Sequence, residues 1–297
     1  MLNLDTSFLY NTLGITCLEN FLTAWIRYDN LPYQSLYYKS FIPVNTTICD
    51  FIRDKQTYLQ YEGIERLHRV SRSLKLYQCI QYDASFDEMM GWLSDKLSIN
   101  LPLMVQIDAD KIKNGNTTVS PWRYDHLLLA YKIEDDVISF LDDYPQRSIQ
   151  YTVNDLKDIF IGSVIQIKPI RLFEINEYLE ACSQALLHME VSRCPLFNEY
   201  GFSRIIYIRD AIGILRISRN RIFEWYKWML INEYIKPDSE LANLLDSQIK
   251  AMNKLYSSIE YIRLRKTDGS NLIKTSLNHL DELDMKISYK LKKVMCL

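Results

Sequence analysis

Hydrophobic and polar residues recur with different periods in the two parts of the chain. Up to about residue 170, several short segments alternate apolar and polar residues or are continuously apolar, which is typical of strands. These segments are residues 76–82, 101–108, 126–133, 137–142, 148–153 and 162–170. Beyond about residue 172, apolar residues recur every three to four positions over long segments joined by short linkers, which is typical of packed helices. The pattern predicts an α+β domain over residues 1–170 and an all-helical domain over residues 171–297.

Helices are also expected within the first domain, over residues 15–28, about 50–72, 86–100 and 154–160. Residues 33–42 fit either a helix or an aromatic strand. In the first helix Thr16 is suited to the N-cap, with Glu19 three residues later as its capping-box partner. Cys17 is then the first helical residue, where the helix dipole and free N–H groups favour a thiolate. The alternative is that Cys17 is a small buried hydrophobic residue, as most free cysteines are.

Residues 126–142 predict a strand pair joined by a turn at residues 134–136. His126 opens the first strand, and alternation along the second strand places Phe140 and Asp142 on one face. A short hairpin then brings Asp142 beside His126, which is the base and orienting acid of a nucleophilic triad. Asp143 competes for the same role, although strand parity favours Asp142. The simpler interpretation is a polar strand end followed by an acidic turn.

Composition excludes several classes of function. The net charge of −2 gives no bulk attraction to nucleic acid or to an anionic membrane, and no apolar run approaches the roughly 20 residues of a membrane span. The first residues lack the features of a secretory signal, so we expect a cytoplasmic protein. The six cysteines include no CxxC pair, and glycine-rich nucleotide-binding loops are absent.

Cys17, His126 and Asp142 follow one another in the order nucleophile, base and orienting acid. Asn11 lies six residues before Cys17, so its side-chain amide and the Cys17 backbone N–H are candidates for an oxyanion hole. We therefore expect Cys17, His126, Asp142 and Asn11 to form a catalytic site. Such a site requires neither a metal ion nor an organic cofactor.

This arrangement resembles the papain-like fold, and in particular its C39-peptidase-like branch. In that branch an amide residue precedes a cysteine at a helix start, and a histidine opens a strand pair that ends in Asp-Pro; residues 142–145, Asp-Asp-Tyr-Pro, stand in for that ending. The resemblance implies an antiparallel sheet with a nucleophile helix. With its helical C-terminal domain, the chain also resembles butirosin-type acyltransferases and the amide-forming enzyme of closthioamide biosynthesis.

The resemblance to these acyltransferases implies that an acyl group passes from a phosphopantetheine thioester on an acyl or peptidyl carrier protein, through Cys17, to an amine. Natural-product biosynthesis would be the setting. A C39-like cysteine peptidase or amidase with the same triad is the alternative, and a non-catalytic relative with an inert Cys17 is a third hypothesis. A basic patch is one candidate for carrier docking, and a solvated helix face is the other interpretation of the same arginines: Arg204, Arg209, Arg216, Arg219 and Arg221.

Overall fold

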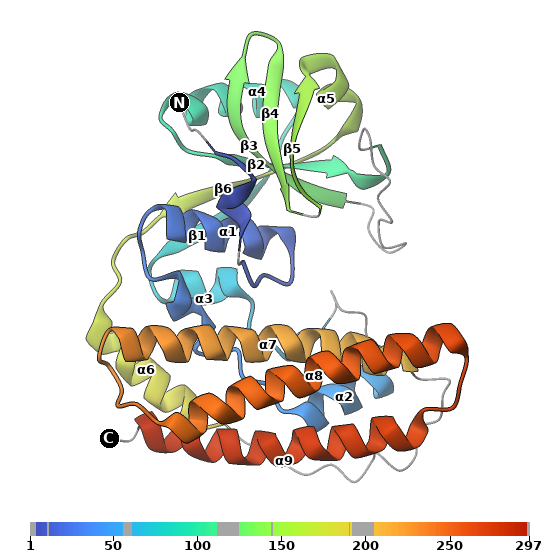
Figure 1. The fold of residues 1–297 in the computed structure, drawn as a ribbon. Coiled ribbons are helices and arrows are strands. Elements are labelled where there is room, and N and C mark those ends of the chain that lie inside the picture. The colour runs from blue at the N-terminus through green and yellow to red at the C-terminus, as the bar shows by residue number, and fades with distance from the viewer. Residues whose placement is uncertain are drawn as a thin grey trace. The chain divides into compact units, whose positions relative to one another are not determined.

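The computed structural model describes residues 4–10, 12–55, 61–111, 125–143, 145–189, 191 and 205–295. The chain forms two compact units (Figure 1). The first combines Met1–Pro32 with Leu67–Phe173, and the second combines Tyr33–Arg66 with Glu174–Leu297. The sequence predicts a boundary near residue 170, and there the structure changes from strands to helices, since β6 ends at Pro169 and α6 begins at Ile175. However, residues 33–66 belong to the helical unit, because their aromatic side chains pack against it; Tyr38, for example, meets Tyr178 edge to face at 5.5 Å.

The first unit is built on a six-stranded sheet in the order β1-β6-β2-β3-β4-β5, in which every neighbouring pair is antiparallel. The strands are β1 (Tyr77–Asp83), β2 (Leu103–Asp108), β3 (Asp125–Glu134), β4 (Val137–Asp143), β5 (Gln146–Thr152) and β6 (Phe160–Pro169). Strands β6, β2, β3 and β4 carry most of the buried side chains of the sheet because they lie inside it, between the edge strands β1 and β5. The α+β class and the antiparallel sheet are therefore confirmed.

The helices of this unit are η1 (Thr6–Leu9), α1 (Cys17–Tyr28), α3 (Leu67–Ser73), α4 (Phe86–Ser98), η3 (Ala109–Lys111) and α5 (Val153–Ile159). Helix α1 packs against β3, β4 and α3, which places its first turn beside the sheet. The continuous helix expected over residues 50–72 is wrong, because residues 61–66 are not helical. The start of the expected helix lies in α2 (Val44–Arg53) of the second unit, and its end lies in α3 of the first unit.

A β-bulge separates two registers in the β3–β4 hairpin. Near the turn Glu134 pairs with Val137 and Lys132 with Ser139, but beyond the bulge Ala130 pairs with Phe140. Directly opposed residues of an antiparallel pair share a face, so the one-residue shift changes which residues of β4 share a face with His126. Without the bulge, that face would hold Asp143. With it, the face holds Asp142.

Among its described residues, the second unit contains η2 (Tyr33–Tyr37), α2, α6 (Ile175–Leu187) and three long helices, α7 (Ile205–Ile231), α8 (Ser239–Arg265) and α9 (Ser270–Met295). Helix α7 packs against α2 and α8, and α9 packs against α2, α6 and α8. Arg219 lies in this core without solvent exposure and pairs with the equally buried Asp284. Its other donors bond to Gln248, Ser218 and the Ile42 carbonyl, as a buried guanidinium requires.

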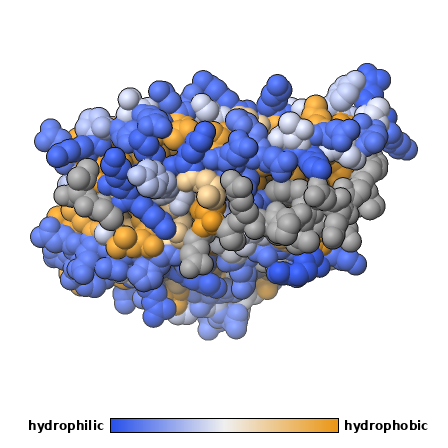
Figure 2. Space-filling view, turned by 90° about the horizontal axis from the view of Figure 1, so that it is seen from below, coloured by the Kyte–Doolittle hydropathy of each residue, from blue (hydrophilic) through white to orange (hydrophobic). Residues whose placement is uncertain are grey.

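Burial of Arg219 and Arg221 excludes both residues from a surface patch, so that part of the docking hypothesis is wrong. Arg209 pairs with Asp210 and Glu260, and Arg216 bonds to Asn253, while Arg204 lies outside the described residues. In the face drawn in Figure 2, hydrophilic residues surround separate hydrophobic patches. Among the described helices, none combines the length and the apolar character needed to cross a membrane.

Candidate active site

Helix α1 begins at Cys17, as its sequence predicts. The Thr16 hydroxyl accepts a hydrogen bond from the Glu19 N–H and caps the helix. The Glu19 carboxylate, which has no solvent exposure, accepts from the Ile15 N–H at 2.7 Å and from the Leu67 N–H at 2.9 Å. Glu19 thereby ties the segment before Cys17 to the start of α3 and fixes the nucleophile's backbone.

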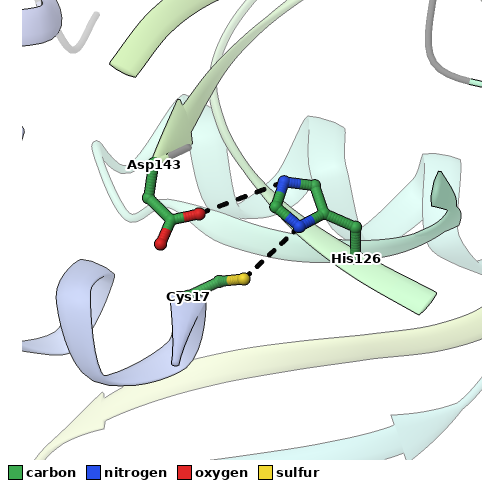
Figure 3. A group of neighbouring side chains, drawn as sticks. All are labelled: Cys17, His126 and Asp143. Atoms are coloured by element: carbon green, nitrogen blue, oxygen red, sulfur yellow. Dashed lines mark hydrogen bonds and ion pairs between the residues drawn. The ribbon is translucent and has the colours of Figure 1, made fainter. Parts of the chain in front are cut away.

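The His126 side chain from β3 meets the Cys17 thiol from α1. Its Nδ1 lies 3.4 Å from Cys17 Sγ, within the limit for a hydrogen bond to sulfur. Figure 3 shows the Cys17 thiol facing one ring nitrogen of His126 and the Asp143 carboxylate facing the other. Cys17 and His126 are only 6% and 5% exposed, so their polar interaction lies in a largely desolvated place. The two residues are 109 positions apart in the chain, and the packing of α1 on the sheet brings them together.

Asp142 is the acid that hydrogen-bonds the histidine. Its Oδ1 lies 2.8 Å from His126 Nε2, whereas the nearest Asp143 oxygen lies 4.0 Å from the same nitrogen. The second Asp142 oxygen accepts from Arg147 Nε at 3.0 Å, and Arg147 stands directly opposite Asp142 in the β4–β5 register. Asp142 is fully buried, and the guanidinium compensates its charge.

Asp143 is held in a different way. Its Oδ2 accepts from Asn20 Nδ2 at 2.9 Å, while its buried Oδ1 has no hydrogen-bond partner among the described residues. The Asn20 Oδ1 accepts from the Gly14 N–H at 2.8 Å, so one amide side chain links the segment before the nucleophile to the end of β4. A Cβ added at Gly14 would lie 2.4 Å from Asn20 Oδ1, which explains the glycine there.

The electrostatics of the site favour a charged imidazole. Burial lowers the pKa of His126, but hydrogen bonds to Asp142 and Cys17 and the charges of both partners raise it by more, to about 10. A proton on the imidazole is thus stabilised by two acceptors, one at each ring nitrogen. This is the protonation state from which a histidine donates to a leaving group.

The arrangement brings together three of the four expected site residues: Cys17, His126 and Asp142. Asn11 lies outside the described residues, so its expected part in an oxyanion hole stays a prediction. Arg147 and Asn20 are not among the site residues predicted from the sequence. A tight hairpin after Asp143 would have paired Asp142 with Arg147, but Asn20 gives no comparable signal because its partner lies 123 positions away.

The same cluster offers metal-ligand chemistry. One ligand atom each from Cys17, His126 and Asp143 lies within 4.8 Å of the others, and all three side chains are buried.

No protein-family model matches the sequence, and no curated protein is significantly similar to it. What the site can do therefore follows from its own geometry: a buried cysteine, histidine and aspartate arranged as in a catalytic triad.

Proposed function

We propose that this protein is a cysteine-dependent acyltransferase that moves an acyl group from a carrier-protein thioester, through Cys17, to an amine. The observation that carries the proposal is the continuous chain from Cys17 Sγ to His126 Nδ1 and from His126 Nε2 to Asp142. In such a chain the carboxylate fixes the imidazole, and the imidazole sits within reach of the nucleophile's proton.

The reaction would proceed in two transfers. The Cys17 thiolate attacks the thioester carbonyl, and the carrier thiol leaves after taking a proton from the His126 imidazolium. An amine then attacks the acyl-Cys17 carbonyl, gives its proton to His126, and releases the amide with regeneration of the thiolate. Asp142 keeps Nε2 protonated, so that Nδ1 performs both proton transfers.

Burial of the site supports transfer over hydrolysis. An acyl-enzyme partitions between water and amine, and a site that excludes water favours the amine. Cys17 is 6% exposed, His126 5% and Asp142 0%, so little bulk water contacts the groups that would activate it. The same triad would also serve a peptidase or amidase, which is the alternative function.

Product analysis separates these functions. Wild-type protein is incubated with a small acyl thioester, with and without a primary amine, and the products are resolved by mass spectrometry. Transfer predicts an amide product that depends on the amine and disappears in Cys17→Ala. Free acid alone, at a rate independent of the amine, would indicate a hydrolase. Cys79→Ala, which removes a thiol from β1 of the same unit, is the matched control.

A further inference from the structure

We propose that Cys17, His126 and Asp143 form a binding site for Zn²⁺, and that the bound ion blocks the nucleophile. Thiolate, imidazole and carboxylate are the three side-chain ligand types that zinc takes in proteins. Their ligand atoms lie within 4.8 Å of one another, and the Sγ–Nδ1 distance is 3.4 Å. Tetrahedral zinc with bonds of about 2.0–2.3 Å separates neighbouring ligand atoms by roughly 3.3–3.6 Å. Cysteine and histidine already have this spacing, and only the carboxylate must move closer.

The histidine has the outer partner that a zinc ligand needs. A metal-bound imidazole commonly donates its other ring N–H to a carboxylate, which fixes the tautomer and the ring orientation. His126 Nε2 lies 2.8 Å from Asp142 Oδ1, and Arg147 holds the second oxygen of that carboxylate. Nδ1 is thereby directed at Cys17 and at the space where an ion would lie.

Asp143 supplies the observation that separates a metal site from a triad alone. The triad uses Asp142, so a second carboxylate with an oxygen within 4.8 Å of the thiol sulfur has no role in acyl transfer. The Asp143 side chain is only 6% exposed, and its buried Oδ1 accepts no hydrogen bond from the described residues. An unsatisfied buried acceptor is costly unless a ligand satisfies it. Asn20 holds the other oxygen at 2.9 Å and keeps the carboxylate beside the cluster.

Three protein ligands leave a fourth position for water. Coordination would displace the proton held between Cys17 Sγ and His126 Nδ1, and this proton would be released to solvent. The ion would then occupy both the thiolate and the imidazole nitrogen that transfers protons, so the ion and an acyl group exclude each other at Cys17. Binding of the ion does not depend on the proposed function. Its inhibitory effect does rest on that function.

The test uses the full chain, stripped of metal by chelation, with Co²⁺ as a spectroscopic probe and Zn²⁺ as its competitor. We expect a thiolate-to-cobalt charge-transfer band with one equivalent of Co²⁺, and its loss on addition of Zn²⁺. The band should be absent in Cys17→Ala and unchanged in Cys79→Ala. Asp143→Asn should weaken Zn²⁺ binding by at least the roughly 10- to 100-fold that loss of an outer-shell partner costs, whereas Asp136→Asn, in the β3–β4 turn, should not.

A measurement on the wild type alone avoids dependence on folding of the variants. Stoichiometric Zn²⁺ should slow alkylation of Cys17 by iodoacetamide at least tenfold, read by peptide mass spectrometry, while alkylation of Cys79 stays constant. Absence of the charge-transfer band, a band that survives Cys17→Ala, wild-type affinity in Asp143→Asn or unprotected Cys17 would overturn the proposal. Acylation of Cys17 by a thioester in the presence of chelator is scored separately, so a failed metal test and a failed acyl-transfer test are distinguishable.

Discussion

Asp142 and Asp143 provide a matched pair of substitutions, because they are adjacent, both nearly fully buried and identical in size. Asp142 Oδ1 lies 2.8 Å from His126 Nε2, within hydrogen-bond distance, whereas Asp143 lies 4.0 Å away, beyond it. A charge-assisted hydrogen bond contributes about 1.5–3 kcal/mol, which corresponds to roughly 10- to 150-fold in rate. Asparagine at 142 would also turn an N–H toward the ring and favour the wrong tautomer, an effect that reaches about 10⁴-fold in a serine triad.

We therefore expect Asp142→Asn to lower the rate of thioester turnover by about 10²- to 10⁴-fold and Asp143→Asn by less than about tenfold. Initial rates with a small acyl thioester are measured in the presence of a chelator, so that bound metal does not contribute. Circular dichroism and thermal melting establish that both variants are folded, since Asp142→Asn removes the charge that Arg147 faces. Equal losses, or a larger loss in Asp143→Asn, would refute the assignment of Asp142 as the orienting acid.

Three further predictions concern stability. Glu19→Ala removes the acceptor of two buried N–H groups, those of Ile15 and Leu67. It should lower the free energy of unfolding, measured by urea titration, by about 2–5 kcal/mol, and Glu19→Gln should lower it by less. Equal stability of Glu19→Ala and wild type would contradict the role given to Glu19. Because the pKa of His126 is raised from 6.5 to about 10, its contribution to stability is fully present below pH 6.5 and is lost as the pH rises to about 10. The stability difference between wild type and His126→Gln should therefore shrink between pH 6.5 and 10, and a difference that is constant or grows over this range would be inconsistent with a raised pKa. Asp284→Ala leaves the buried charge of Arg219 without its partner and should lower the free energy of unfolding by about 3–5 kcal/mol. The double variant Arg219→Met with Asp284→Leu should recover most of that loss. An Asp284→Ala variant as stable as wild type would rule out a stabilising ion pair.

Local sequence signals were sufficient to predict much of the secondary structure of the α+β unit. The Thr16 cap defines the start of α1, and alternation defines β3 and β4, because both signals act within a few residues. Strand alternation correctly placed Phe140 and Asp142 on one face of β4. That face is the one shared with His126 only because of the bulge between Ala130 and Lys132. The sequence pattern gives no sign of this bulge, so the preference for Asp142 over Asp143 was correct without its structural reason.

Long-range packing accounts for what the sequence did not predict. The helical pattern over residues 50–72 is interrupted because its two ends pack into different units. Arg219 looks like a surface residue on a long helix, and it is buried because Asp284, 65 positions away, and Gln248 satisfy it. Asn20 joins the segment before the nucleophile to Asp143 through a contact across 123 positions. Each of these depends on partners that periodicity and spacing cannot identify.

The central claim is that Cys17 carries an acyl group during turnover. Intact-protein mass spectrometry after brief incubation with an acyl thioester tests it most directly. We expect a mass increase equal to one acyl group on the wild type, located on Cys17 by peptide mapping and removed when a primary amine is added. The gain should be absent in Cys17→Ala and strongly slowed in His126→Ala. No gain on wild type under single-turnover conditions, or a gain that persists in Cys17→Ala, would contradict covalent catalysis at this site.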